Sequence, residues 1–146
     1  MKSAEHAIEV EVTPDQFYAL IIDFERYPDF VPRQSEARVL TAEPDRAHWR
    51  VAFELQVARK LRYTLDLQGD PGRSLQWTLV EGEWMTYNVG GWTLEPLDGG
   101  KRTRAIYRLD VTLGGFVPRT VTNTLVERTL PETLEAFRKE AERRAH

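Results

Sequence analysis

The sequence predicts an α+β fold in which a curved antiparallel sheet of about seven strands wraps around a long C-terminal helix. Most of the chain between residues 37 and 113 alternates apolar and polar residues, the period typical of half-buried strands. Residues 5–12 show the same alternation, and helix signals follow them directly. An apolar stripe at helical spacing occupies residues 117–141. One striped helix and one apolar sheet face must cover each other, which predicts this arrangement.

The N-terminal segment predicts one strand followed by two short helices. Residues 5–12 place acidic side chains on one face and apolar side chains on the other. Thr13, Pro14 and Gln16 suit the N-cap, first and third positions of a helix, the pattern of a capping box. Residues 23–32 contain two prolines and indicate a helix end and a short second helix.

The middle of the chain predicts a series of strands joined by turns. Gly-, Pro- and Asp-containing turns are expected at residues 43–46, 69–72 and 98–100. Gly90 and Gly91 interrupt one strand and predict a bulge or bend there. The expected strands are residues 37–40, 49–55, 61–67, 75–79, 87–97 and 105–113.

The C-terminal segment predicts a long amphipathic helix. Pro131 removes a hydrogen bond within that helix, and Thr129 with Glu132 forms a second capping pattern from which the helix is expected to restart. The stripe consists of Val117, Val121, Leu125, Leu130, Leu134, Phe137 and Ala141.

Length and composition exclude several classes of protein. The 146 residues fit one domain, expected to span residues 1–146, and 41% hydrophobic content excludes a disordered chain. The absence of cysteine excludes disulfides and thiol chemistry. Nucleic-acid-binding domains are typically basic, whereas this chain has a net charge of −3, so a nucleic acid partner is not expected. No apolar run of about 18 residues predicts a membrane span, and the polar N-terminus lacks a signal-peptide pattern, so a cytoplasmic location is expected.

The predicted inner face of the sheet is rich in large aromatic residues. A curved sheet closed by one helix leaves room for an apolar ligand cavity. The same residues would equally fill a solid core, with their polar tips bonded to the backbone, and periodicity alone favours that alternative. The inward set is Trp49, Phe53, Tyr63, Trp77, Tyr87, Trp92 and Tyr107.

Catalytic motifs are nearly absent. The sequence has no GxSxG, P-loop, GxGxxG or HExxH pattern, and its three histidines are too scattered for a local metal site. No metal or cofactor is therefore expected. The only candidates for proton transfer are Tyr63, Tyr87, Tyr107 and His6. An ordinary tyrosine has a pKa of about 10 and is therefore a poor base at neutral pH. For His6, a structural role is the favoured interpretation.

Three segments resemble the START-like (SRPBCC) superfamily. They are residues 23–32 (DFERYPDFVP), residues 80–84 (VEGEW) continuing to residues 90–97 (GGWTLEPL), and residues 134–138 (LEAFR) in the last helix. The first two are similar to the branch that includes coenzyme Q-binding proteins, polyketide cyclase/dehydrase relatives and the bacterial ribosome-association toxin. The order of elements agrees over nearly the whole chain.

The resemblance implies a helix-grip fold with a deep hydrophobic cavity between sheet and helix. It implies a hydrophobic ligand such as a lipid, an isoprenoid quinone or a polyketide, but one fold serves many chemistries. The expected ligand-binding residues are Trp49, Phe53, Tyr63, Leu65, Trp77, Tyr87, Trp92, Tyr107, Leu125 and Phe30.

Three functions remain open at this point. The favoured hypothesis is a non-catalytic carrier or chaperone for a hydrophobic small molecule. The alternatives are a polyketide aromatase/cyclase, which would use the tyrosines, and a ribosome-association role. The last would use a basic patch of Arg26, Arg33 and Arg38, although a solvated face is the favoured interpretation of these arginines. The oligomeric state is left open.

Overall fold

The computed structural model describes residues 1–115 and 117–146 of the chain. No helix in this described part has both the length and the hydropathy needed to cross a bilayer. The elements are β1 (Lys2–Val10), α1 (Pro14–Ile21), η1 (Phe24–Arg26), α2 (Tyr27–Phe30), β2 (Gln34–Glu43), η2 (Pro44–Arg46), β3 (His48–Gln56), β4 (Lys60–Asp70), β5 (Ser74–Gly82), β6 (Met85–Leu97), η3 (Asp98–Gly100), β7 (Arg102–Leu113), α3 (Arg119–Thr124), the π-helix η4 (Leu125–Thr129) and α4 (Leu130–Ala145).

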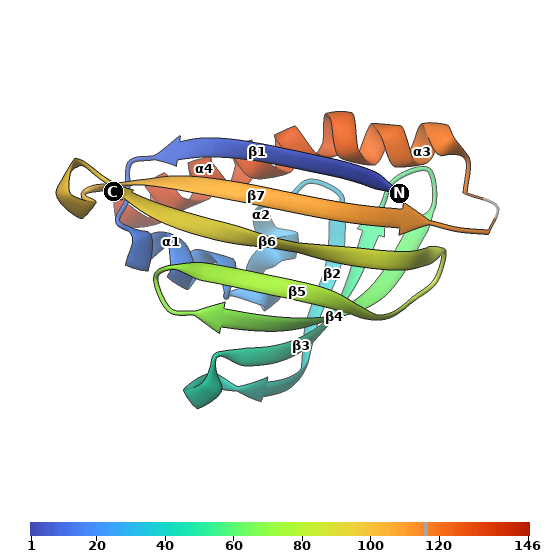
Figure 1. The fold of residues 1–146 in the computed structure, drawn as a ribbon, viewed down its shortest axis with the longest axis horizontal. Coiled ribbons are helices and arrows are strands. Elements are labelled where there is room, and N and C mark those ends of the chain that lie inside the picture. Colours follow the sequence, from blue (N-terminus) through green and yellow to red (C-terminus); the bar gives the residue numbers. More distant parts are fainter. Residues whose placement is uncertain (116) are drawn as a thin grey trace.

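The predicted α+β fold is confirmed. In the described part of the chain, seven strands form one antiparallel sheet in the order β1-β7-β6-β5-β4-β3-β2. Figure 1 shows α1, α2 and α4 on one side of this sheet, with the C-terminal helix running beside β1. Helix α4 contacts β1, α1 and α2. The sheet therefore curves around the C-terminal helix, and the core lies between them.

The first helix begins as its capping pattern predicts. The backbone N–H of Gln16 donates to Thr13 Oγ1 over 3.1 Å, and the backbone N–H of Thr13 donates to Gln16 Oε1 over 2.9 Å. Pro14 occupies the first turn, where its missing N–H is not needed. Phe17 and Leu20 are buried against the sheet, so this local signal also orients the apolar face of α1.

The second strand is longer than its alternation predicts. We expected residues 37–40, and β2 runs from Gln34 to Glu43. Its pairing with β3 shifts register between Gln34 and Glu36 and again between Val39 and Thr41. Each shift adds one residue and moves the following side chains to the other face, which breaks the two-residue period. The sequence pattern therefore reveals only the part between the two shifts.

The predicted bulge at Gly90 and Gly91 is wrong, because pairing with both neighbouring strands continues in register through these residues. The glycines instead allow close approach. A Cβ on Gly90 would lie 2.5 Å from the carbonyl oxygen of Arg108 and 2.8 Å from Trp77 Cζ2. The Trp77 ring therefore covers the bare backbone of Gly90, its cross-strand partner.

The C-terminal helix is continuous through Pro131, and the predicted restart at Thr129 is wrong. Thr129 has helical dihedrals (φ −67°, ψ −41°) and no side-chain cap. One π-helical turn precedes Pro131, in which the N–H of Leu130 donates to the carbonyl of Leu125, five residues back. In a regular α-helix the N–H of residue 131 would bond the carbonyl of Glu127, which proline cannot do. The extra residue of the π turn accommodates this break, as π-bulges do.

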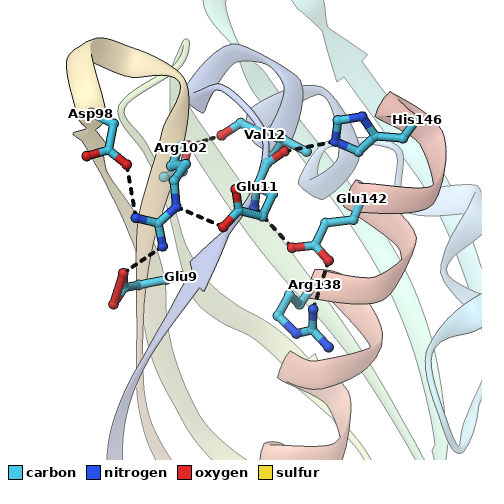
Figure 2. A network of polar contacts seen from close by, with 9 residues as sticks. Glu9, Glu11, Val12, Asp98, Arg102, Arg138, Glu142 and His146 are labelled. Carbon is cyan, nitrogen blue, oxygen red and sulfur yellow. Dashed lines mark hydrogen bonds and ion pairs between the residues drawn. The ribbon is translucent and has the colours of Figure 1, made fainter.

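A polar network holds the end of α4 against β1 (Figure 2). The backbone N–H of Glu11 donates to Glu142 Oε2 over 3.0 Å, and His146 Nε2 lies 3.2 Å from the Glu11 carbonyl oxygen. Arg102 on β7 donates to Glu11 Oε1 over 2.9 Å, and Arg138 donates to Glu142 over 2.8 Å. These contacts fix the helix over the sheet at the end opposite η4.

Candidate ligand-binding site

A cavity of about 120 Å³ lies between the sheet and the C-terminal helix. Its walls come from the inner faces of the strands β2–β7, from α2 and the residue after it, and from η4 and α4. The lining residues are Tyr27, Val31, Gln34, Phe53, Leu55, Tyr63, Leu65, Leu67, Leu75, Trp77, Met85, Asn88, Trp92, Tyr107, Leu109, Val111, Leu125, Thr129, Leu130, Thr133 and Phe137.

Most of the residues expected to bind a ligand do line this cavity. The aromatic rings of the wall also pack on one another. Trp92 lies edge-on to Tyr107 and to Phe137, with ring centroids 5.0 Å and 5.5 Å apart. The aromatic set therefore forms both a core and a cavity wall, which explains why the space is small. The expected residues that line it are Phe53, Tyr63, Leu65, Trp77, Trp92, Tyr107 and Leu125.

Two expected residues lie behind the wall. Trp49 is buried against Phe24, with ring centroids 5.5 Å apart. Phe30 packs edge-on against Phe137, with ring centroids 5.1 Å apart. Phe30 therefore supports the lining residue Phe137, and neither Trp49 nor Phe30 is part of the cavity lining.

The prediction that Tyr87 faces the interior is wrong. Its side chain is 43% exposed, whereas its neighbour Asn88 is buried and lines the cavity. The pairing of β6 with β7 shifts register between Met85 and Tyr87, so one extra residue reverses the alternation there. His6 lies on the inner face of β1, paired with Tyr107, at the edge of the sheet and outside the set of lining residues.

Sequence reasoning missed the polar residues of the wall. Trp77 Nε1 donates to Asn88 Oδ1 over 3.0 Å, and Gln34 Nε2 donates to the carbonyl of Glu54 over 3.1 Å. Thr129 and Thr133 face the cavity from the C-terminal helix. The five-residue step from Leu125 to Leu130 in the apolar stripe was a usable signal, since it falls on the π turn.

The tyrosines in the wall are neutral. Burial raises the pKa of Tyr63 to about 12, although the neighbouring Gln34 side chain lowers it. Burial also raises the pKa of Tyr107, with a smaller contribution from the proximity of Tyr63. The Tyr27 hydroxyl donates to the Ile21 carbonyl over 2.5 Å, and burial raises its pKa well above 10.0. These phenols can donate hydrogen bonds but cannot act as bases near neutral pH.

The described lining contains no Asp, Glu, Lys, Arg or His side chain. No group of three or more potential ligands among His, Cys, Asp and Glu could hold a metal ion in the described residues. The chemistry of this wall is therefore that of an apolar surface carrying a few neutral hydrogen-bonding groups, the composition typical of small-molecule sites.

The charged side chains line open depressions on the outer face of the sheet. One of them, of about 560 Å³, is lined by Arg38, Glu54 and Arg62 among others. Arg62 Nε donates to Glu54 Oε2 over 2.8 Å, and Glu36, Glu81 and Glu83 lie around the same depression. Acidic side chains therefore surround Arg38, and the predicted basic patch does not extend over this face.

Comparisons with known proteins agree with the fold. Residues 10–138 match the family model described as polyketide cyclase/dehydrase and lipid transport. The ribosome association toxin RatA of Vibrio cholerae is 33% identical over 99 residues, which is 67% of this chain and 67% of that protein.

Solved structures superpose over nearly the whole chain. The Zhui aromatase/cyclase from a Streptomyces species has a TM-score of 0.88 at 22% identity, covering 99% of this chain and 96% of that one. A START superfamily protein from Mycobacterium smegmatis has a TM-score of 0.84 at 19% identity, covering 97% of both chains. At these identities the likeness shows the helix-grip fold alone.

Proposed function

The chain belongs to the polyketide cyclase/dehydrase and lipid transport family, and from this premise we propose that it carries a neutral, hydrophobic small molecule in the cavity without transforming it. The observation that carries the proposal is the wall itself, which is apolar apart from neutral hydrogen-bonding groups. Buried apolar surface contributes about 25 cal/mol per Å², so shape and area can supply affinity without a charged anchor. General acid–base catalysis is most efficient with a group that titrates near the working pH, and the described wall has no Asp, Glu, Lys, Arg or His side chain.

The size of the cavity restricts what fits without rearrangement. An engineered cavity of about 150 Å³ binds benzene, and the space here is about 120 Å³. A single ring or a short chain therefore matches it. A lipid, an isoprenoid quinone or a polyketide would require the C-terminal helix to move away from the sheet or the aromatic rings to change rotamer.

The test is to identify what the protein carries. Purified protein is analysed by native mass spectrometry, then denatured in organic solvent, and the extract is compared with that of a cavity-filling variant. Leu109→Phe adds a ring to the wall, whereas Leu40→Phe makes the same change at an exposed position on β2. We expect a stoichiometric neutral compound with wild type and Leu40→Phe, and its loss with Leu109→Phe.

Two outcomes would contradict the proposal. One is a ligand retained in full by a folded Leu109→Phe variant, because the compound would then bind elsewhere. The other is an extract free of ligand together with no binding by any member of a panel of quinones, fatty alcohols and single-ring aromatics.

A polyketide aromatase/cyclase is the second candidate, favoured by the hydroxyls of Tyr63 and Tyr107 in one wall. Neutral phenols could stabilise an enolate oxygen by donating hydrogen bonds, although they could not remove the proton. A cyclase assay on a poly-β-ketone substrate tests this. Unchanged cyclisation in the Tyr63→Phe and Tyr107→Phe variants would remove these residues from the mechanism.

The ribosome-association hypothesis has one supporting observation, the similarity to RatA. The acidic residues around Arg38 argue against a wide contact with RNA, because such contacts rely on basic side chains that neutralise phosphates. Co-sedimentation with ribosomes at low salt tests it, with an Arg26→Glu and Arg33→Glu double variant as the control for a charge-dependent contact.

A further inference from the structure

The hydroxyl of Thr129 is a buried polar group with no partner in the described structure. The residue is 2% exposed, its Oγ1 atom makes no hydrogen bond, and it lines the cavity. Thr133, one turn later on the same wall, donates its hydroxyl hydrogen to the Thr129 carbonyl over 2.9 Å. The usual intrahelical bond of a helical threonine is therefore made at position 133 and absent at 129.

The π turn explains why Thr129 lies in the cavity wall. Thr129 is the last residue of η4, directly before Leu130 and Pro131. The turn inserts one residue into the helix, so Leu125 and Leu130 both face the sheet although they are five positions apart. Thr129 reaches the wall between them. π-Bulges are frequent at functional sites, and here the bulge coincides with the unpaired group.

An unpaired hydroxyl away from water is unfavourable, so such groups in native structures require an explanation. Two other polar groups of the wall have partners: Asn88 accepts from Trp77, and Gln34 donates to the Glu54 carbonyl. The described lining of the cavity is mostly aromatic and aliphatic and contains no charged side chain. An anion or cation placed there would lose its hydration without compensation.

We propose that Thr129 Oγ1 is the polar anchor of the ligand and donates a hydrogen bond to a neutral carbonyl or hydroxyl oxygen. This rests on the proposed function and deepens it by naming the ligand class. The apolar part of the ligand lies against the rings of Trp77 and Trp92. The site selects neutral oxygen-bearing compounds over hydrocarbons of the same shape and over carboxylates.

Three matched single-ring compounds test this inference by isothermal titration calorimetry. Acetophenone carries a neutral carbonyl, α-methylstyrene has the same shape without the oxygen, and benzoate carries a charge. We expect wild type to bind acetophenone about fivefold to tenfold more tightly than α-methylstyrene, the value of one hydrogen bond. Benzoate should bind more weakly than either compound.

The variants assign that preference to one atom. Thr129→Val keeps the shape and removes the hydroxyl, so it should bind the two neutral compounds equally. Thr129→Ser should restore the preference for acetophenone. Thr124→Val, the same change at an exposed position on α3, should behave as wild type.

A second measurement separates an anchor from a structural residue. Without ligand, Thr129→Val should melt at or above the temperature of wild type, because it removes an unpaired polar group. A marked fall in its melting temperature would mean that the hydroxyl stabilises the fold, which would overturn the proposal.

The two proposals fail in different ways. Equal binding of acetophenone and α-methylstyrene by wild type would overturn the role of Thr129 and leave carriage of a hydrophobic molecule intact. A preference for acetophenone that persists in Thr129→Val would do the same. Binding of none of the three compounds to wild type would reject both the anchor and uptake of a ring-sized ligand.

Discussion

Trp77 and Asn88 are joined by a hydrogen bond of 3.0 Å from the indole Nε1 to the amide Oδ1, between the neighbouring strands β5 and β6. Both side chains are buried and line the cavity. The Asn88 amide nitrogen also lies 3.5 Å from Met85 Sδ. The bond fixes the orientation of the Trp77 ring, which packs at 5.5 Å from Tyr107. It therefore helps to define the shape of the cavity.

Replacing Asn88 by leucine should destabilise the protein by about 1–3 kcal/mol, because it leaves the buried indole N–H without an acceptor. The free energy of unfolding is measured by urea denaturation. Thr93→Val, at an exposed position of the same strand, should change it by less than about 0.5 kcal/mol. Equal values for the two variants would show that the Trp77 bond contributes little.

Replacing Gly90 by alanine should cost about 1–3 kcal/mol, because the new methyl group meets backbone. Its Cβ would lie 2.5 Å from the Arg108 carbonyl oxygen, which the sheet holds in place. Gly114→Ala is the matched control, since its Cβ would meet only the Thr86 side chain, at 3.0 Å or more. Urea denaturation of both variants should rank Gly90→Ala well below Gly114→Ala in stability, and the reverse order would contradict the argument.

His48 should make stability depend on pH. Its Nδ1 lies 3.0 Å from Glu43 Oε1 and its Nε2 lies 2.8 Å from Asp66 Oδ1. The hydrogen bonds with Glu43 and Asp66 raise the pKa of His48 above 6.5. The protonated ring is favoured in the folded state, so its stabilisation is fully present below about pH 6.5 and is lost as the pH rises through the folded pKa.

The His48→Gln variant tests this sign. The difference in free energy of unfolding between wild type and variant should be larger at about pH 5.5 than at about pH 8.5. An NMR titration of the ring protons should give a midpoint above that of a model histidine. A midpoint at or below 6.5 would contradict the prediction.

The cavity tyrosines should make the protein sensitive to alkali. Burial raises the pKa of Tyr63 from 10.0 to about 12. Unfolded tyrosine loses its proton first, so stability should fall as the pH rises from about 10 towards 12. Tyr63→Phe should show a shallower fall in free energy of unfolding over this range. A phenol absorbance change that is lost in Tyr63→Phe but centred near pH 10 in wild type would contradict the burial argument.

The local signals in the sequence were sufficient for the elements and their order. The capping box at Thr13 and Gln16 forms as predicted, because its partners are three residues apart and need nothing else from the fold. The alternation of β3, β4 and β7 and the stripe of the last helix placed most of the aromatic residues on the correct face. The α+β class and the inward position of Phe53, Tyr63, Trp77, Trp92 and Tyr107 follow from these periods.

Several errors arise where one residue is added to a regular element. The register shift beside Tyr87 reverses its face, and the shifts in β2 hide more than half of that strand. The extra residue of η4 brings Thr129 to the wall. The position of each insertion depends on how the strand or helix packs against its neighbours. A one-residue insertion changes the periodic pattern of the sequence so little that the pattern does not show where the insertion lies.

The sequence by itself determined the order of the helices and strands, the family and the apolar aromatic character of the inner face, because these depend on local spacing and composition. Only the tertiary structure decided how much space the aromatic rings leave and which polar groups remain unpaired beside it. Both depend on contacts between residues far apart in the chain, such as Trp92 with Phe137 and Gln34 with Glu54. A cavity is the volume left over by all such contacts together, so no single segment of the sequence encodes it.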